Sequence, residues 1–298
     1  MFGDFPGPVV VGVDDSPGAI PAVRWAAREA ARLHRPLRVV HATEEILLGA
    51  PRPYRDVGEV REMVRIHGHR LLQAAGRAVR EEVGEIGPRL ILRGERRARA
   101  LLDEAADACL VVLATPGIRP MGRVFAGSVS IALSAHVRCP LAIVRGHVAE
   151  DSPPEDGPVV VGVDGSPASE AALALAFEEA SWRQAPLTAV HCWEDRFLAA
   201  VREEKRLTLH SPAVAEHEHE VLGQRLAGWR EKYPDVPVNR EVVRGRAAER
   251  LLDFTDRARM LVVGNRGHGG VAGLLLGSTC QAVMSYALCP VLVARDKG

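Results

Sequence analysis

The chain repeats itself over its whole length, and this duplication constrains its fold more than any other feature. The stretch VVVGVDDSPGA at positions 9–19 returns as VVVGVDGSPAS at positions 159–169, which is 150 positions later. The same spacing relates His41 to His191, Gly117 to Gly267, Gly127 to Gly277, and Cys139 to Cys289. A match at one fixed spacing across two whole halves indicates the tandem duplication of one domain, not an array of short repeats.

The two copies are joined by a segment that differs from both in composition. Residues 147–157 are acidic, rich in proline and poor in apolar side chains, which is typical of a linker. We therefore predict a first domain at 1–146, a linker at 147–157 and a second domain at 158–298. The length of 298 residues suits two domains of ordinary size.

Each half contains five short apolar runs separated by segments with helical spacing. The runs are 8–14, 37–42, 89–93, 109–114 and 141–145 in the first half, and 158–164, 187–192, 238–243, 260–264 and 290–295 in the second. They are continuous, as is typical of strands buried on both faces. Strands that alternate with helices predict an α/β fold, with a doubly wound parallel sheet covered by helices on both faces in each half. Ser16-Pro17 and Ser166-Pro167 predict helix starts, with serine as the cap and proline in the first turn.

The composition indicates an ordinary globular protein. Apolar residues make up 47% and charged residues 26%, and the formal net charge is zero. Balanced charge gives no electrostatic case for a nucleic acid or a membrane surface as partner. No apolar run approaches the length of a membrane span and the N-terminal stretch lacks a signal-peptide pattern, so we expect no membrane insertion and a cytoplasmic location. The five cysteines have apolar neighbours and form no C-x-x-C pair, which favours reduced, buried thiols.

The stretch GNRGHGGVAGLLLGST at 264–279 follows the fourth apolar run of the second half. Glycine loses much conformational entropy on folding and buries no side chain, so its repeated use needs a local reason. A glycine-rich loop that runs into a helix start presents free N–H groups and the positive end of the helix dipole, which together bind phosphate. If the strand order is 3-2-1-4-5, Asp164 at the end of the first strand faces this loop across the crevice where the order reverses. Because a carboxylate there can accept hydrogen bonds from a ribose, the pattern predicts a bound nucleotide.

Two better-known phosphate loops do not fit this chain. The pattern G-x-x-x-x-G-K-[ST] is absent, and the dinucleotide fingerprint should follow the first strand, where this chain has VDGSPAS. A flexible loop without a ligand is the alternative, but it leaves the spacing of the glycines and their duplication unexplained.

The spacing Gly264-x2-Gly267-x9-Gly277-Ser278 resembles G-x2-G-x9-G-[ST], the ATP-binding signature of universal stress proteins. VVVGVDGSP, the run that ends in His191, and CPVLVAR add to the resemblance, which covers nearly the full length of both halves and is similar to the tandem two-domain members. It implies a five-stranded parallel sheet of order 3-2-1-4-5 in each half, ATP bound in each half, and a role in stress or dormancy adaptation. Mg²⁺ could accompany the ATP, bound through its phosphates.

In the second half, the resemblance implies a set of residues around the ATP. Near the adenine and ribose it places Gly162, Val163 and Asp164, with backbone contacts to the adenine from Cys192. Around the ribose and phosphates it places Gly264, Gly267, Gly277, Ser278, Thr279 and Cys280. The family prefers a hydroxyl where Cys280 stands, so one phosphate contact would be weaker.

The first half carries counterparts of this set with one departure. They are Gly12, Val13, Asp14, Ala42, Ala114, Gly117, Arg119, Gly127, Ser128, Val129 and Ser130. Ala114 replaces the first glycine of the signature, and a Cβ where the backbone should approach the ligand could narrow this site. We predict binding in both halves, with the second half as the better match to the motif.

Several of these residues also have a simpler interpretation. Asp14 and Asp164 could cap the following helices, either alone or in addition to binding a ribose. Arg119 and Arg266 suit a solvated charge as well as a phosphate partner.

The remaining polar motifs do not predict catalysis or a metal site. His41 and His191 lie near strand ends, where packed and hydrogen-bonded rings are commoner than proton-transfer groups. The H-x-H pairs at 67–69 and 217–219 do not place both rings on one helix face, so we predict no metal there. Ser128 and Ser278 lie outside G-x-S-x-G, and a phosphate-binding hydroxyl at a helix start explains both.

We therefore predict a nucleotide-dependent regulator that acts through unknown protein partners, with ATP turnover absent or slow. The alternative is an enzyme that hydrolyses or transfers at ATP phosphates. The turn after the first strand lacks the Ser-Gly-Gly-x-Asp-Ser pattern that some related nucleotide hydrolases use, and no acidic metal cluster or general base joins the loop. A flavin or electron-transfer module is disfavoured because the loop suits a single phosphate chain. Two such chains could also associate as a homodimer.

Overall fold

The computed structural model describes residues 5–43, 57–84, 86–115, 127–145, 156–193, 212–267 and 276–295. The chain divides into two compact units, Met1–Ser152 and Pro153–Gly298. The predicted linker at 147–157 lies outside the described residues except for its last two positions, so the exact domain boundaries stay predictions.

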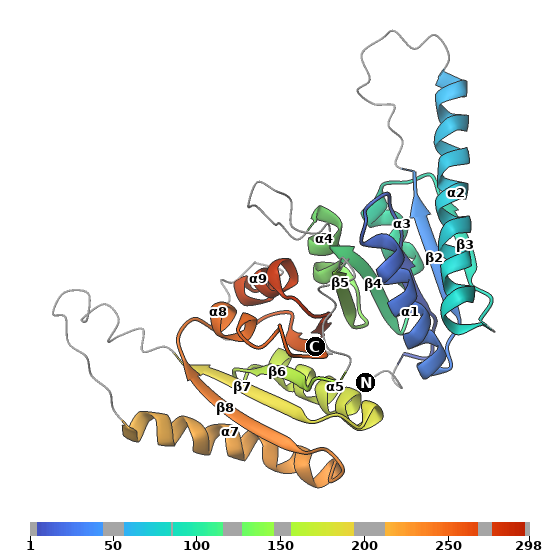
Figure 1. Cartoon of the computed structure of the whole chain (residues 1–298). Coiled ribbons are helices and arrows are strands. Elements are labelled where there is room, and N and C mark those ends of the chain that lie inside the picture. The colour runs from blue at the N-terminus through green and yellow to red at the C-terminus, as the bar shows by residue number, and fades with distance from the viewer. Residues whose placement is uncertain are drawn as a thin grey trace, which may run out of the picture. The chain divides into compact units, whose positions relative to one another are not determined.

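The first unit alternates strands and helices along the chain (Figure 1). Its elements are β1 (Val9–Gly12), α1 (Ala19–Leu33), β2 (Leu37–Ala42), α2 (Val57–Val83), β3 (Arg89–Arg93), α3 (Arg97–Glu104), β4 (Leu110–Thr115), α4 (Ser128–His136) and β5 (Leu141–Arg145). The strands lie in the order β3-β2-β1-β4-β5, and each neighbouring pair is parallel.

The second unit has the same architecture. Its elements are β6 (Val159–Val163), α5 (Pro167–Arg183), β7 (Leu187–Trp193), α7 (Pro212–Lys232), β8 (Val238–Arg244), α8 (Ala247–Leu252), β9 (Met260–Gly264), α9 (Ser278–Tyr286) and β10 (Val291–Ala294). The strands lie in the order β8-β7-β6-β9-β10, again all parallel. The predicted α/β fold with the order 3-2-1-4-5 in each half is therefore confirmed.

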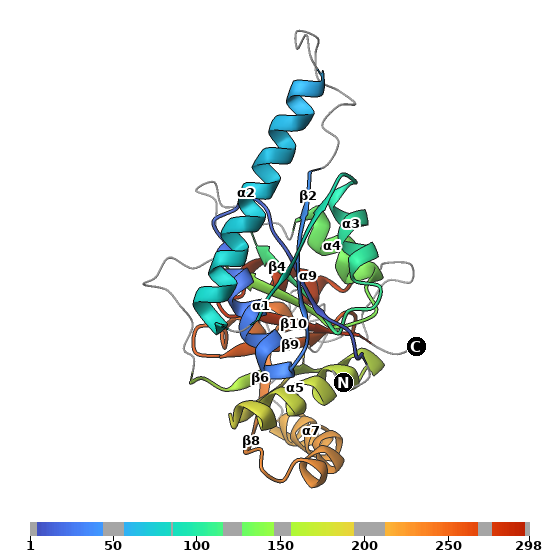
Figure 2. The ribbon, with the colours of Figure 1, turned by 90° about the vertical axis from the view of Figure 1, so that its right-hand side faces the viewer.

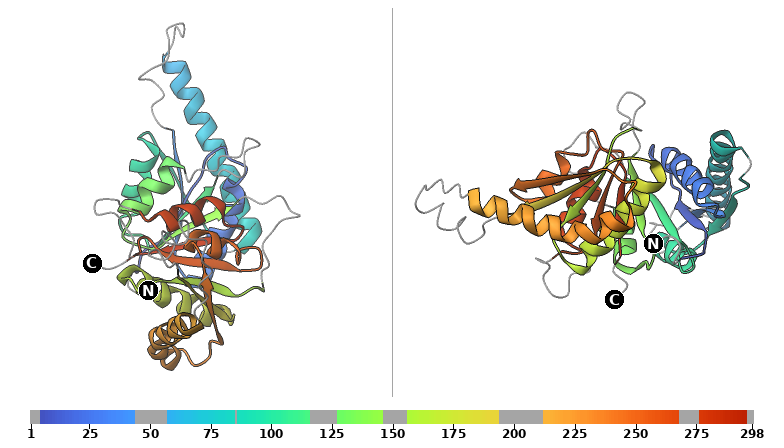
Figure 3. Two further views of the ribbon diagram at one scale, coloured as in Figure 1. Left: turned by 90° about the vertical axis from the view of Figure 1, so that its left-hand side faces the viewer. Right: turned by 90° about the horizontal axis from the view of Figure 1, so that it is seen from below.

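Helices cover both faces of each sheet, which explains why the strands are apolar throughout. In the first unit α1 and α2 pack on one face, and α3 and α4 on the other (Figure 2). In the second unit the sheet lies between α5 and α7 on one side and α8 and α9 on the other (Figure 3). Val9, Val10 and Val11 of β1 are fully buried, as continuous apolar strands between two helical layers must be.

The starts of the two equivalent helices α1 and α5 differ. Ser166 caps α5 as predicted, with Pro167 as the first helical residue. The same prediction for Ser16 is wrong, because α1 begins only at Ala19 and Ser16 lies in a preceding turn. The sequence at the next turn explains the difference, since Ser169 supplies a backbone N–H and a hydroxyl to the turn in the second unit, whereas Ala19 has no hydroxyl to offer.

The predicted strand bounds are correct to within two residues. β1 ends at Gly12 and β6 at Val163, so Asp14 and Asp164 follow their strands and do not end them. Both aspartates therefore lie in the turn beyond the carboxyl end of a central strand. This is the position from which a side chain can face a ligand at the reversal of strand order.

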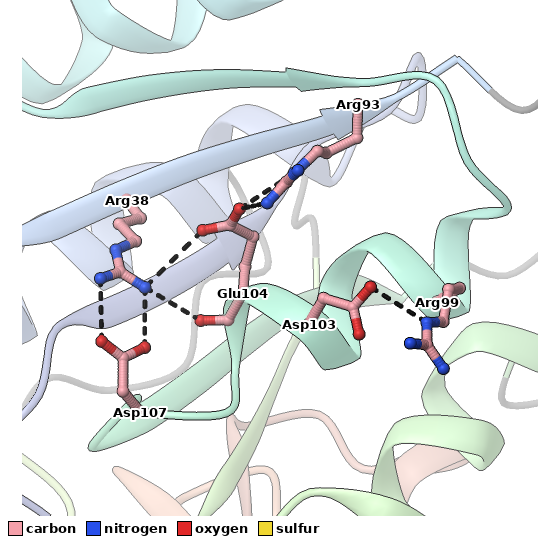
Figure 4. A network of polar contacts seen from close by, with 6 residues as sticks. All are labelled: Arg38, Arg93, Arg99, Asp103, Glu104 and Asp107. Carbon is pink, nitrogen blue, oxygen red and sulfur yellow. Dashed lines mark hydrogen bonds and ion pairs between the residues drawn. The ribbon is translucent and has the colours of Figure 1, made fainter.

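A polar network attaches α3 to the sheet of the first unit (Figure 4). Glu104 is buried, and its Oε1 accepts a hydrogen bond from Arg93 Nε at 3.0 Å. Arg38 donates to the main-chain oxygen of Glu104 at 3.2 Å and to both carboxylate oxygens of Asp107 at 2.7 and 2.9 Å. The guanidinium of Arg38 thus connects β2 to the C-terminal end of α3.

Candidate functional site

The carboxylate of Asp164 is held in the turn that follows β6. Its Oδ1 accepts hydrogen bonds from the N–H of Ser166 at 3.0 Å and from the Ser166 hydroxyl at 2.6 Å. Its Oδ2 faces Gly267, where an added Cβ would overlap this oxygen. Asp164 therefore supports the helix start through one oxygen and borders the glycine-rich loop with the other.

Two buried serines fix the backbone of this turn. Ser166 Oγ accepts a hydrogen bond from the N–H of Ser169 at 3.2 Å. In return, Ser169 Oγ accepts from the N–H groups of Asp164 and Gly165 at 3.2 and 3.3 Å. Gly165 has φ +80°, a left-handed conformation that favours glycine. The position of the Asp164 carboxylate is thus set by the local sequence.

The glycine-rich loop leaves β9 and returns to the same strand end. Gly277 donates its N–H to the carbonyl of Asn265 at 2.9 Å, and Asn265 donates its own N–H to Ala294 of β10 at 3.1 Å. Residues 268–275 lie outside the described part. The ends of the loop are therefore anchored on the strand end that neighbours β6.

Helix α9 begins directly after Gly277, and its first backbone N–H groups lie outside the helical hydrogen-bond ladder. Its hydrogen-bond ladder begins with the N–H of Gln281, which donates to the Gly277 carbonyl at 3.0 Å. The N–H groups of Ser278, Thr279 and Cys280 precede this ladder and have no acceptor within the helix. Gly277 makes no side-chain cap, and the first turn carries no acidic residue. Such a helix start attracts an anion through its N–H groups and its dipole.

The structure shows a packing role for Gly264. A Cβ at this position would lie 2.7 Å from the carbonyl carbon and oxygen of Ala168 and 2.8 Å from its Cβ. Gly264 is therefore required by the close packing of β9 against the start of α5. In the first half the residues at the two corresponding positions are exchanged, since Ala114 corresponds to Gly264 and Gly18 to Ala168. Each half thus has one glycine and one alanine at this contact, and the effect of Ala114 on a ligand site stays a prediction.

The two equivalent histidines form hydrogen bonds with the main-chain oxygens of the residues that precede Asp164 and Asp14. His191 Nδ1 lies 2.7 Å from the carbonyl oxygen of Val163, and His41 Nδ1 lies 2.8 Å from that of Val13. His191 also contacts Glu218 of α7, with 3.0 Å between Nε2 and Oε2. Both rings are packed and hydrogen-bonded, as the sequence predicts.

The Cys192 and Cys280 thiols of the second half are poorly suited to act as nucleophiles, because burial raises their pKa values. Burial raises the pKa of Cys280 to about 12, and its Sγ contacts Met284 Sδ at 3.7 Å inside the core. Only the backbone of Cys280 can therefore face a phosphate. Burial also raises the pKa of Cys192 to about 11. This side chain is only half-buried, so the prediction of buried thiols is wrong for it.

Ser278 is exposed and Thr279 half-buried, so both hydroxyls are accessible at the helix start.

The first half places its counterparts in the same way. Asp14 is exposed and its Oδ1 accepts the N–H of Ser16 at 3.0 Å. Gly127 precedes α4, whose ladder begins with the N–H of Ile131 donating to Gly127 at 3.0 Å. Ser128 is exposed and Ser130 is buried, like Ser278 and Cys280. The predicted residues Gly117 and Arg119 lie outside the described residues.

The protein-family comparison matches the universal stress protein family model twice, at residues 7–145 and 157–295. The chain belongs to this family. It is 40% identical over 295 residues to universal stress protein Rv2623 of Mycobacterium tuberculosis, covering 97% of this chain and 96% of that protein. It is 36% identical over 299 residues to a universal stress protein of Mycolicibacterium smegmatis, covering 97% of each.

A solved structure supports the fold at lower sequence identity. A universal stress protein from Archaeoglobus fulgidus superposes with a TM-score of 0.70 at 18% identity, covering 98% of this chain and 97% of that one. The chain is thus a tandem universal stress protein along its whole length.

Sequence reasoning missed four residues near the candidate site in the second unit of this universal stress protein. They are Ser169, Glu218, Asn265 and Arg225. Arg225 of α7 lies over Gly165, where an added Cβ would overlap its guanidinium, and it also binds Glu170 at 3.3 Å. A comparison of the two repeats could have found them, because all four differ from their counterparts Ala19, Gly68, Thr115 and Ala75.

The H-x-H pairs lie on helices, and one of their rings has a carboxylate partner. His67 Nε2 lies 2.7 Å from Asp15 Oδ1. Within the ranges that the structure describes, no group of three His, Cys, Asp or Glu side chains could hold a metal ion. No helix in those same ranges is both long and apolar enough to cross a membrane.

Proposed function

We propose that each half of this universal stress protein binds ATP and that the chain is a nucleotide-dependent regulator in stress or dormancy adaptation. One observation carries the proposal: the carboxylate of Asp164, the Gly267 backbone and the start of α9 lie at the carboxyl ends of the neighbouring strands β6 and β9. A carboxylate suits a ribose, and free helix N–H groups suit phosphates. In the first half, Asp14 and the start of α4 are the described counterparts of this set.

The proposal includes slow or absent turnover of the nucleotide. Asp164 already accepts two hydrogen bonds from Ser166 through Oδ1, which suits an acceptor for ribose hydroxyls and not a general base. Mg²⁺ would be held by the phosphate oxygens and water, as this ion prefers. The alternative function, hydrolysis or transfer at the ATP phosphates, is distinguished by the nucleotide that the protein retains.

The test is to identify the nucleotide that copurifies with the protein. The purified chain is denatured without added nucleotide, and released bases are quantified by chromatography. We expect ATP, and a reduced amount in Gly277→Ala, where an added Cβ meets described protein atoms only at 3.4 Å or beyond. Because the described protein atoms leave room for that methyl group, we interpret a loss of ATP as a lost ligand contact.

Gly228→Ala is the matched control, because Gly228 is exposed on α7 with no described atom within 4 Å of the added Cβ. This variant should retain the wild-type amount of ATP. ADP or AMP in place of ATP would support the alternative function, an enzyme that hydrolyses or transfers at the ATP phosphates. No nucleotide, together with no binding on titration, would overturn the proposal.

Regulation would act through protein partners, and two chains would associate as a homodimer in a cytoplasmic location. Ligand binding to the folded state stabilises it by mass action, so ATP can shift the conformation that partners meet. Light scattering with and without ATP measures the association, and cell fractionation measures the location.

A further inference from the structure

His191 lies between two acceptors at the edge of the second candidate site. The Val163 carbonyl lies 2.7 Å from Nδ1, and the Glu218 carboxylate lies 3.0 Å from Nε2. The side chains of His191 and Glu218 are 15% and 24% exposed, so water screens this pair only in part. The ring thus links the residue before Asp164 to helix α7.

The chemistry of imidazole makes this arrangement depend on a proton. A neutral imidazole donates from only one ring nitrogen, whereas the charged ring donates from both. Because a carbonyl oxygen and a carboxylate are both acceptors, the two hydrogen bonds form together when His191 is protonated. When the ring is neutral and donates to Val163, the lone pair of Nε2 faces the charged oxygen of Glu218 and α7 loses this attachment.

The first half lacks the second acceptor. His41 Nδ1 makes the same bond to Val13 at 2.8 Å, but Gly68 occupies the position of Glu218. An added Cβ at Gly68 would lie 2.9 Å from His41 Cδ2, so the helix backbone packs directly against the ring. His41 thus packs against the α2 backbone without a carboxylate at the position of Glu218, and the His67–Asp15 pair of α2 is an exposed contact elsewhere on that helix.

The other titratable groups near His191 do not replace this pair. In the turn after β6 stands Asp164, whose Oδ1 accepts hydrogen bonds from Ser166. On β8, Val242 lies beside His191, and its exposed neighbour Glu241 pairs with Val190. On α7, His217 and His219 flank Glu218 and are exposed.

From these contacts we propose that His191 and Glu218 are positioning residues that attach α7 to the second site in a protonation-dependent manner. This rests on the proposed nucleotide site only for its consequence, which is that the second site binds ATP more weakly as pH rises and the first does not. The sign follows from the pair: a histidine that gains a carboxylate partner stabilises the fold while it is protonated and loses that contribution as the ring deprotonates.

Hydrogen exchange of the full chain without nucleotide tests the attachment by itself. Protection of α7, corrected for the intrinsic pH dependence of exchange, should fall by roughly fivefold between about pH 5.5 and 8, as expected for one lost hydrogen bond. Protection of α2 should not change over this range in Asp15→Asn, which removes the exposed carboxylate partner of His67 on that helix. Equal behaviour of α7 and α2 would overturn the proposal.

Glu218→Gln is the decisive variant, because a glutamine amide can donate to Nε2 of the neutral ring and accept from Nε2 of the charged ring. We expect it to keep the protection of α7 and to abolish its pH dependence, with His219→Gln as a control that behaves like the wild type. If Glu218→Gln instead loses protection at all pH values, the role of Glu218 is merely structural and the proposal fails.

Calorimetric titration with ATP then tests the consequence. The affinity of the second site, isolated in Gly127→Ala, should fall as pH rises and become pH-independent in Gly127→Ala/Glu218→Gln. Absence of any ATP binding would contradict the proposed function but leave the hydrogen-exchange result standing. Binding with a pH dependence that Glu218→Gln does not alter would overturn the link between the pair and the site.

Discussion

The two repeats share one topology but solve the same packing problems with different residues. Where β9 meets α5, Gly264 faces Ala168, and at the corresponding positions of the first unit the alanine is on the strand and the glycine before the helix. Where α3 meets the sheet, the first unit buries the carboxylate of Glu104, and the second has Phe254 at that position. The comparison teaches that a departure from a motif has to be judged together with its packing partner.

The largest expected effect comes from adding a methyl group to Gly264, the glycine of the contact between β9 and α5. Gly264→Ala should reduce the free energy of unfolding by about 3 kcal/mol, because the Cβ meets backbone atoms that cannot move aside cheaply. Gly264→Ala/Ala168→Gly, which copies the first unit, should recover more than half of that loss. Urea unfolding of the single and double variants measures this coupling, and strictly additive losses would contradict the compensating exchange.

Removing the carboxylate of the first unit should have the next largest effect. Glu104→Ala removes the buried carboxylate that accepts from Arg93 and lies 3.6 Å from Arg38 Nη1, and we expect a loss of about 2 kcal/mol in unfolding free energy. Its counterpart Phe254→Ala should cost a similar amount through lost packing alone. Urea unfolding at low and high salt separates the lost ion pair from the lost packing, because only the loss in Glu104→Ala should shrink as salt is added. Equal salt responses of the two variants would contradict the assignment of different causes.

A single hydroxyl should account for the different helix starts. Ser169→Ala removes the acceptor for the N–H groups of Asp164 and Gly165, and we expect a loss of about 1 kcal/mol. The start of α5 should also move toward position 169, as α1 starts at Ala19. Amide exchange at positions 164–169 measures the change, and an unaltered α5 start would show that Ser169 does not set it.

The smallest effect concerns the pH dependence of the first unit. Hydrogen bonds from Arg38 hold the pKa of Asp107 below its usual value. Because the folded-state pKa is depressed, the pair stabilises the fold above the pKa of an unfolded aspartate and loses that contribution as pH falls through the lower folded-state value. Asp107 is largely exposed, so Asp107→Asn should cost only about 0.5 kcal/mol at neutral pH.

The check on this prediction is thermal unfolding across the acidic range. The difference between Asp107→Asn and the wild type should vanish as pH falls below the titration of Asp107. Arg257→Gln is the matched control, since Arg257 takes this position in the second unit and lies over the Phe254 ring at 5.4 Å. A pH-independent difference for Asp107→Asn would rule out the ion pair as its cause.

The fold could be predicted from the sequence because its signals are local and occur twice. The continuous apolar strands and the fixed spacing between repeats determine the sheets, and the turn residues after β6 determine where Asp164 lies. The contacts of Gly264, Glu218 and Arg225 could not be predicted, because each depends on which helix face meets which strand. The Ser16 prediction failed because the Ala19 N–H donates to the main-chain oxygen of Ser16 in a turn, and the helix begins only at Ala19.

The central claim is that both repeats carry an ATP site despite their different packing. Calorimetric titration of nucleotide-free protein with ATP tests it most directly, using Gly127→Ala for the first half and Gly277→Ala for the second. We predict two sites per chain in the wild type, one in each single variant and none in the double variant, with Gly228→Ala unchanged. A single site that Gly277→Ala alone removes would contradict the account, because it would show that the first half does not bind ATP.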